Sequence, residues 1–200
     1  AGTCCDVADD AVLEVVRSVG DDNVGIAGNW VALRTRPFAR VPRADSSPSS
    51  SFVTAMDTNP LATDPTVVIA ERADDFANGL KVLTRLTEGP VNVCAAPNVS
   101  IPGNEIEGVR EINFSGPHPA GLAGTHIHLV DPVSATKTVW SIGYQDVIAI
   151  GKLFVSGFLD IERIVSICGP LAKSPRLIKT YMGASLDDLL KNEFLNDSPC

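Results

Sequence analysis

The strongest pattern along the chain is a stripe of apolar residues with helical spacing. It consists of Phe76, Leu80, Leu83 and Leu86. Because positions i, i+4, i+7 and i+10 lie on one side of an α-helix, the stripe predicts an amphipathic helix that begins near Asp74. Gly89 and Pro90 follow the stripe and predict the end of this helix, since proline cannot continue it.

Two other segments repeat apolar residues at helical spacing. The first consists of Val12, Val15, Val16 and Val19. It follows two aspartates and predicts a short packing helix that ends near Gly20. The second covers residues 144–155 and is followed by Gly157, a residue type that commonly ends helices. Asp146 in its first turn is expected to stabilise the positive end of the helix dipole.

Short apolar runs on either side of the central helix predict buried strands at residues 52–56 and 91–95. Together with the helix they form a strand–helix–strand unit with tight connections, and such units are right-handed with parallel strands. Further strands are predicted at residues 111–114 and 138–142. The predicted fold class is therefore α/β with a mainly parallel sheet.

The pattern changes after Gly157. Residues 161–168 and 176–182 are strand-like and are separated by Gly-Pro and Ser-Pro turn signals. The sequence Ser-Leu-Asp-Asp at residues 185–188 resembles a capping box that opens a short helix. Two strands and one short helix are too little to close a domain, so we expect an incomplete second domain.

These patterns divide the chain into three parts. Residues 1–48 are expected to hold the N-terminal helix and a basic loop that belongs to the first domain, residues 49–157 its α/β core, and residues 158–200 the start of the second domain. The chain begins at Ala1 and stops at Cys200, and we expect both ends to be cuts in a longer protein.

Composition and charge narrow the class of protein. The chain has 200 residues, 44% of them apolar, which is enough for a buried core. No apolar run approaches the ~20 residues of a membrane-spanning helix, and no secretory signal is recognisable, so a cytoplasmic location is expected. A net charge of −8 opposes binding to nucleic acid, which we exclude as a partner.

Cysteine and histidine are common metal ligands, but neither is arranged as a metal site. The five cysteines include no C-x-x-C pair, so we predict no zinc site, iron–sulfur cluster or disulfide framework. His126 and His128 would share one face of an extended segment, with His118 upstream, but two ligands do not make a site. We favour hydrogen-bonded structural histidines and predict no metal-binding residue.

The best candidate for binding is the basic segment, residues 34–43. It carries four arginines, two prolines and no acidic residue, and it predicts an extended loop. Its arginines, with Trp30 and Phe38 nearby, could bind a quinone head group by hydrogen bonding and stacking. They could instead bind acidic groups of a partner protein, or pair with acidic groups of the chain itself at the surface.

Four segments carry a resemblance to a known family. Residues 30–38, 52–61, 116–126 and 144–154 resemble the A subunits, called NqrA, of the bacterial Na+-translocating NADH:quinone oxidoreductases. The resemblance extends over nearly the whole chain from about residue 29. It implies a Rossmann-like domain up to about Gly157, followed by the start of a β-grasp domain of the soluble-ligand-binding type. Full-length members are expected to add an N-terminal lipoyl-like domain and further C-terminal sequence.

The resemblance also implies a role in a respiratory complex of six subunits, which couples NADH oxidation and ubiquinone reduction to Na+ export. The chain would be a peripheral subunit on the cytoplasmic face of the bacterial inner membrane, held by other subunits, chiefly a membrane subunit. Flavins and an iron–sulfur cluster are expected in those other subunits. Because the NqrA family is associated with a quinone-interacting region, residues 33–40 are carried over as a quinone-binding candidate.

The family is similar to the NADH-binding flavoprotein of respiratory complex I and to the equivalent subunit of the Rnf complex, which bind flavin through a glycine-rich loop. This chain has bulky residues and a proline there, which remove the space and a backbone donor that phosphate needs. No G-x-G-x-x-G occurs, and Gly151-Lys152 lies late in an apolar helix without the other residues of a P-loop. We therefore predict no flavin, no NADH and no other cofactor in this chain.

No catalytic residue is predicted either. Ser166 and Cys168 lie in an apolar strand without a neighbouring base, and no G-x-S-x-G motif occurs. The turn at residues 57–60 follows a strand at the edge where α/β sheets bind ligands, and it could line a residual pocket.

We expect a structural and docking subunit that is inactive by itself. The alternatives are a quinone-binding subunit, or a degenerate nucleotide-binding module for a soluble ligand. The residues expected to bind quinone or a partner are Trp30, Leu33, Arg34, Arg36, Phe38 and Arg40.

Overall fold

The structure, a computed structural model, describes residues 31–43 and 45–195. The helix predicted near residues 12–20 and the candidate residue Trp30 lie outside the described residues. No described helix is both long enough and apolar enough to cross a membrane.

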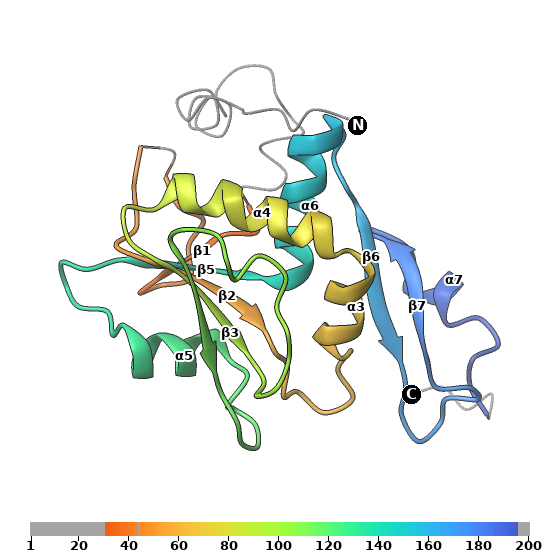
Figure 1. The fold of residues 1–200 in the computed structure, drawn as a ribbon. Coiled ribbons are helices and arrows are strands. Elements are labelled where there is room, and N and C mark those ends of the chain that lie inside the picture. Colours follow the sequence, from red (N-terminus) through yellow and green to blue (C-terminus); the bar gives the residue numbers. More distant parts are fainter. Residues whose placement is uncertain (1–30, 44, 196–200) are drawn as a thin grey trace.

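A five-stranded sheet forms the centre of the larger part of the molecule (Figure 1). Its strands are β1 (Arg34–Arg36), β2 (Ser51–Ala55), β3 (Val91–Ala95), β4 (Val109–Asn113) and β5 (Val139–Gly143). Their order is β1-β5-β2-β3-β4, and all neighbours are parallel except β1, which pairs antiparallel with β5. The predicted α/β class with a mainly parallel sheet is confirmed.

Helices cover both faces of this sheet (Figure 1). On one face, α4 (Ala73–Leu86) packs against α6 (Tyr144–Ser156), and the short α3 (Pro65–Glu71) lies beside them. On the other face, α5 (Ala123–Val130) packs against β2. Alternate residues of a strand point to opposite faces, so Val53 joins the core under α4 and α6 while Phe52 joins the smaller core under α5.

Two glycines allow α4 and α6 to approach closely. A Cβ atom on Gly151 would lie 1.8 Å from the carbonyl oxygen of Asp75, and one on Gly79 would lie 2.1 Å from that of Val147. Both neighbours are backbone atoms of the facing helix. Gly151 therefore serves helix packing, and the sequence Gly151-Lys152 is not a phosphate loop.

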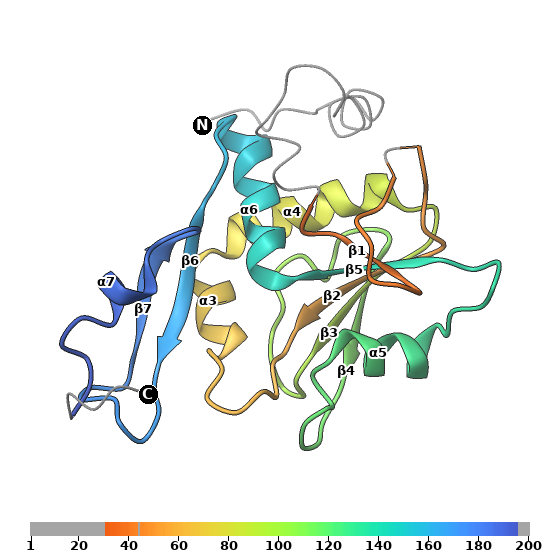
Figure 2. The same cartoon turned by 180° about the vertical axis from the view of Figure 1, so that it is seen from behind.

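After α6 the chain leaves the sheet. Gly157 ends the helix with φ 76°, a left-handed conformation that suits glycine. Strands β6 (Glu162–Ile167) and β7 (Arg176–Tyr181) then form an antiparallel pair, and α7 (Leu186–Leu189) follows. The pair lies beside α3 and α6, on the side of the molecule away from α5 (Figure 2). As predicted, Ser185 caps α7 by accepting a hydrogen bond from the backbone N–H of Asp188 at 3.3 Å.

Two sequence predictions need correction, and one helix was missed. The basic segment is not a loop throughout, because it begins with strand β1. Residues 125–128 are not extended but belong to helix α5, so His126 and His128 do not share a face. Helix α3 was not predicted, although Asp64 accepts a hydrogen bond from the N–H of Thr66 and Pro65 occupies the first turn, which are both helix-start signals.

Candidate functional site

Strand β1 places the basic segment at the edge of the sheet. Its register opposite β5 pairs Arg34 with Ser141 and Arg36 with Val139. Leu33, directly before the strand, is 1% exposed and belongs to the main core. The structure therefore places Leu33 as an anchor of the segment and leaves the arginines at the surface.

The chain closes a tight turn after β1. The N–H of Thr35 donates to the carbonyl oxygen of Arg40 at 2.8 Å, and the N–H of Arg40 donates to the Thr35 hydroxyl at 3.1 Å. Phe38 and Ala39 take positive φ angles of 78° and 47° at the tip. As a result Phe38 projects into solvent at 78% exposure, with the Arg40 guanidinium 5.5 Å from its ring centre. This distance is typical of a cation–π contact.

Arg34 and Arg36 hold the base of the turn. Arg34 Nη1 donates to two carbonyl oxygens just before strand β1, that of Leu33 at 2.9 Å and that of Val31. Arg36 extends over helix α5, because a Cβ atom on Gly124 would lie 3.3 Å from Arg36 Nη2. The segment is therefore joined to α5 as well as to β5.

Ion pairing within the chain distinguishes Arg43 from the other arginines. Arg43 bonds Asp45 through Nε at 3.0 Å and Nη2 at 2.9 Å, in an exposed pair. Within residues 31–43 and 45–195, Arg34, Arg36 and Arg40 form no ion pair. One interpretation of the segment was that its arginines pair with acidic groups of the chain itself. Among the described contacts, Arg43 forms such a pair.

The carboxyl ends of β2 and β4 carry two loops that lie against each other. The N–H of Gly121 donates to the Thr58 hydroxyl at 2.9 Å, and the same hydroxyl lies 3.3 Å from His118 Nδ1. A Cβ atom on Gly121 would lie 2.7 Å from the backbone nitrogen of Thr58. Asp57 turns its carboxylate back to the N–H of Asn59 at 2.8 Å. The two loops thus form hydrogen bonds with each other at the edge of the sheet where nucleotides bind in related folds.

The electrostatics at the start of α6 disfavour phosphate. Burial raises the pKa of Tyr144, and the nearby carboxylates of Asp57 and Asp64 raise it further, against a hydrogen bond from Gln145. Asp146 lies in the first turn of the same helix. Arg163 at 2.7 Å and Arg34 offset the charge of Asp146. Asp57 and Asp64 instead add negative potential, which opposes a phosphate.

The three histidines occupy three different environments. His118 contacts Thr58, His128 is exposed, and His126 is fully buried in α5 with Nε2 2.8 Å from the carbonyl oxygen of Ala120. The His126 ring packs on Phe114 with centroids 4.3 Å apart. Burial lowers the pKa of His126, although the hydrogen bond to Ala120 opposes this shift. Among the described residues, no three His, Cys, Asp or Glu side chains are grouped as a metal site.

The two thiols described in the structure are not arranged as nucleophiles. Cys94 is buried in strand β3, and burial raises its pKa to about 12. The Cys168 thiol donates to the carbonyl oxygen of Leu61 at 3.2 Å and lies 2.8 Å from the Ser166 hydroxyl. A serine hydroxyl is not a base that would activate a thiol.

An apolar hollow of about 610 Å³ lies over the β6–β7 pair. Its lining includes Val165, Ile167, Ile178, Leu189 and Phe194. None of the predicted binding residues lines it, so it is separate from the basic segment. Sequence reasoning missed this hollow because the residues that form it are spread over strand, turn and helix from Arg163 to Phe194.

Known protein families match both parts of the chain. Residues 18–159 match a family model described as the NqrA second alpha/beta domain, and residues 164–199 match a model described as the NQRA C-terminal domain. Relatives named as the A subunit of a Na(+)-translocating NADH-quinone reductase include that of Rhodopirellula baltica, 54% identical over 90% of this chain and 40% of the relative. Others are those of Pasteurella multocida (57%, 86% and 38%) and Shewanella frigidimarina (58%, 88% and 39%). The chain thus spans about two fifths of the length of these relatives.

Proposed function

The chain belongs to the NqrA family, the A subunits of the Na+-translocating NADH-quinone reductases, and from this premise we propose that it is a peripheral docking unit of such a complex. In this proposal it lies at the cytoplasmic face of the inner membrane, held by other subunits. The complex couples NADH oxidation and quinone reduction to Na+ export. Electrons pass through flavins and an iron–sulfur cluster in other subunits, and this chain carries no redox cofactor of its own.

The observation that carries the proposal is that the basic segment lies exposed at the edge of the sheet. The chain has a net charge of −8, yet Arg34, Arg36 and Arg40 are concentrated on one exposed edge of the sheet without an ion pair among the described residues. Phe38 adds an exposed aromatic ring between them. Arginine and aromatic residues are enriched at protein interfaces, and a basic patch on an acidic protein selects an acidic partner surface.

The closed carboxyl edge of the sheet supports the part of the proposal that concerns cofactors. The loops after β2 and β4 bond each other through Thr58 and Gly121, and the carboxylates of Asp57 and Asp64 act on Tyr144 at the start of α6. A flavin or dinucleotide would need this edge open and its phosphates matched by free N–H groups.

A membrane subunit with an acidic loop is the partner that this surface fits best. The test compares retention of the complex's membrane subunits by the chain and by a variant in which Arg34, Arg36 and Arg40 are replaced with Ala. We expect retention to fall about tenfold or more, since arginine is enriched among the few residues that dominate the energy of an interface. The control replaces Lys81, Arg110 and Lys191 with Ala, which removes the same charge from exposed positions elsewhere.

The docking proposal fails if the arginine variant is retained as well as the unchanged chain. If both triple variants lose retention equally, the effect is one of net charge and the basic segment is not the docking site.

Quinone binding is a second candidate, favoured by the contact between Arg40 and Phe38. A guanidinium and an aromatic ring could hold a quinone head group by hydrogen bonding and stacking. We rank it below docking because binding sites for small molecules enclose most of the ligand, whereas Phe38 protrudes at 78% exposure. Titration of a soluble short-chain quinone should then leave the NMR shifts of residues 33–40 unchanged, and specific shifts there would reverse the ranking.

A further inference from the structure

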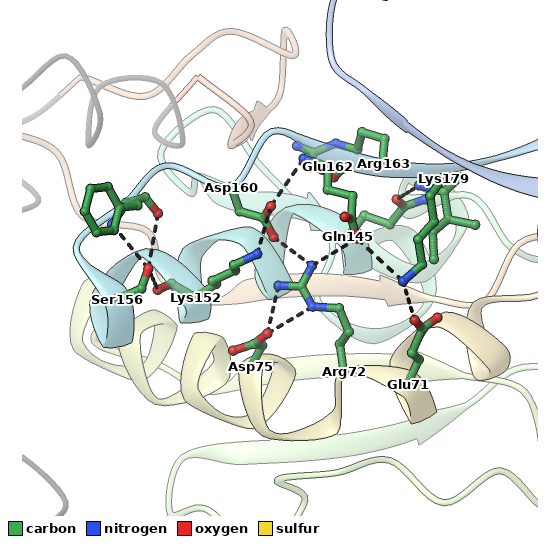
Figure 3. A network of polar contacts seen from close by, with 12 residues as sticks. Glu71, Arg72, Asp75, Gln145, Lys152, Ser156, Asp160, Glu162, Arg163 and Lys179 are labelled. Carbon is green, nitrogen blue, oxygen red and sulfur yellow. Dashed lines mark hydrogen bonds and ion pairs between the residues drawn. The ribbon is translucent and has the colours of Figure 1, made fainter. Parts of the chain in front are cut away.

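A cluster of charged residues joins the β6–β7 pair to the helices of the α/β unit (Figure 3). Its centre is Arg72, between α3 and α4, with a side chain that is 14% exposed. Arg72 bonds Asp75 of α4 through Nη2 at 2.7 Å and Nε at 2.9 Å. Its Nη1 lies 2.7 Å from Asp160 Oδ2, in the segment before β6, and 3.9 Å from Glu162 in β6 itself.

Further ion pairs surround this centre. Lys152 of α6 lies 3.4 Å from Asp160, and Lys179 of β7 pairs with Glu71 of α3 and lies 3.8 Å from Glu162. Next to Glu162 in β6, Arg163 Nη2 bonds Asp146 of α6 at 2.7 Å. Apart from the contact of Lys179 with Glu162, these pairs join the α/β unit to the β6–β7 pair or to the segment that leads into it.

Gln145 adds two hydrogen bonds across the same boundary. Its Oε1 accepts from the N–H of Ile164 at 2.9 Å, and its Nε2 donates to the carbonyl oxygen of Ile164 at 3.0 Å. In an antiparallel pair alternate residues turn their N–H away from the partner strand, so Ile164 is free to bond Gln145 instead of β7. Ile164 is also the residue of β6 that joins the main apolar core of the described chain.

Beside this apolar contact, ion pairs and hydrogen bonds hold the boundary. Asp160 has a side chain 5% exposed. Burial alone would raise the pKa of Asp160, but the Arg72 guanidinium beside it brings it below its ordinary value. Removing Arg72 would leave a buried carboxylate without its main counter-charge, which costs far more than breaking an exposed pair.

The covalent connection across the boundary is short, and apart from Asp160 it includes residues with little packing. It runs through residues 157–161, where Gly157 has a left-handed φ and Phe158 is 77% exposed. Such a segment can act as a hinge, because little packing is lost when its backbone angles change.

We propose that Arg72, with Asp75, Asp160 and Glu162, is an electrostatic latch that holds the β6–β7 pair in one orientation against α4 and α6. When the latch is released, the pair moves about residues 157–161. Neutralising these carboxylates acts in the direction of release, because Arg72, Lys152 and Lys179 are then left facing one another without compensation. Salt acts in the same direction through the more exposed pairs of Lys152 and Lys179.

Hydrogen exchange at single amides in the 200-residue chain tests this proposal. The Ile164 amide reports the boundary because it bonds Gln145, and the Met182 amide reports the β6–β7 pair because it bonds the carbonyl oxygen of Ile161 at 2.8 Å. In an Arg72→Gln variant we expect Ile164 to exchange about tenfold faster or more, while Met182 keeps its rate. Raising the salt concentration should move the unchanged chain in the same direction.

Two further variants keep the test decisive. Asp160→Asn removes the buried charge without touching a helix, and it should reproduce the effect even if Arg72→Gln does not fold. Arg176→Gln breaks the 2.7 Å ion pair between Arg176 of β7 and Glu193, which does not cross the boundary. It should leave the exchange rate of the Ile164 amide unchanged. Unaltered Ile164 exchange in Asp160→Asn, or an equal rise at Ile164 and Met182, would overturn the latch.

Discussion

At the scale of single residues, His126 shows how a buried side chain holds a loop. Its Nε2 lies 2.8 Å from the carbonyl oxygen of Ala120, and its Nδ1 is buried without a hydrogen-bond partner in the described structure. A neutral imidazole that donates from Nε2 suits this site, because protonation would bury a second N–H with no acceptor. The neutral form of His126 therefore fixes residues 114–122, which contact Thr58.

The stability of the fold should depend on pH through this histidine. Burial lowers the pKa of His126, so the folded chain binds fewer protons than the unfolded chain. The contribution is fully present above the ordinary pKa of about 6.5 and is lost as pH falls through the lower value of the folded state. We expect urea unfolding midpoints to fall with pH in that range, and His126→Gln to remove this part of the dependence.

His128→Gln is the matched control, because His128 lies two positions away in the same helix and is exposed. It should leave the pH dependence of the midpoint as it is. If His126→Gln and His128→Gln behave alike, the buried imidazole is not the group that titrates.

The sequence alone could not place these histidines. The pattern Thr-His-Ile-His alternates in a way that suits a strand, and eight residues are too few to show a helical stripe. Ile127 settles the conformation by packing with Phe52 and Cys94 under the sheet, and that contact depends on residues more than 30 positions away. Tertiary contacts override local preference here.

At the scale of elements, the crossing of α4 and α6 depends on glycine. A methyl group on Gly151 would meet the Asp75 carbonyl oxygen at 1.8 Å, and this atom cannot move without displacing the helix. We expect Gly151→Ala to lower the free energy of unfolding by about 3 kcal/mol, as overpacking does in a close-packed core. Chemical denaturation followed by circular dichroism measures this change.

The comparison for that variant is Gly143→Ala at the start of the same helix. A methyl group there would lie 3.5 Å from Asp146 Oδ2, an ordinary contact, so the loss of stability should be small. Equal losses in Gly151→Ala and Gly143→Ala would mean that close helix approach is not what Gly151 provides.

Elements with a strong local signal were predictable. The apolar run at residues 91–95 coincides with β3, and the stripe from Phe76 to Leu86 lies within α4. Strand β1 was not recognised, since Arg-Thr-Arg lacks apolar alternation and is a strand through its pairing with β5. Helix α3 has seven residues, too few for a periodic pattern to outweigh the surrounding turn residues.

At the scale of the whole molecule, the candidate surface and the boundary between the two units depend on long-range contacts. The arginines of the basic segment were identifiable from composition, but their exposure depends on β1 lying at the sheet edge. Arg72 and Asp160 are 88 positions apart in the sequence, and no local pattern connects them. The fold brings them together by placing α3 and α6 beside β6.

The β6–β7 pair should depend on the α/β unit for its stability more than the α/β unit depends on the pair. A two-stranded sheet with one short helix is marginally stable in water, whereas the five-stranded unit has a large core of its own. We expect Thr180→Pro, which removes a backbone donor in β7, to abolish protection of the Met182 amide while the α/β unit stays folded. Thr180→Val keeps the donor and should retain that protection.

Trp140 provides the readout for the larger unit, because it is 2% exposed in the core and the chain has one other tryptophan, Trp30. In a Trp30→Phe background, Thr180→Pro should leave the urea midpoint of Trp140 fluorescence nearly unchanged. Gly151→Ala should lower that midpoint, because α4 and α6 pack in the same core as Trp140. A fall in the Trp140 midpoint of similar size in both variants would instead show one cooperative unit, in which the β6–β7 pair stabilises the α/β core as much as it is stabilised by it.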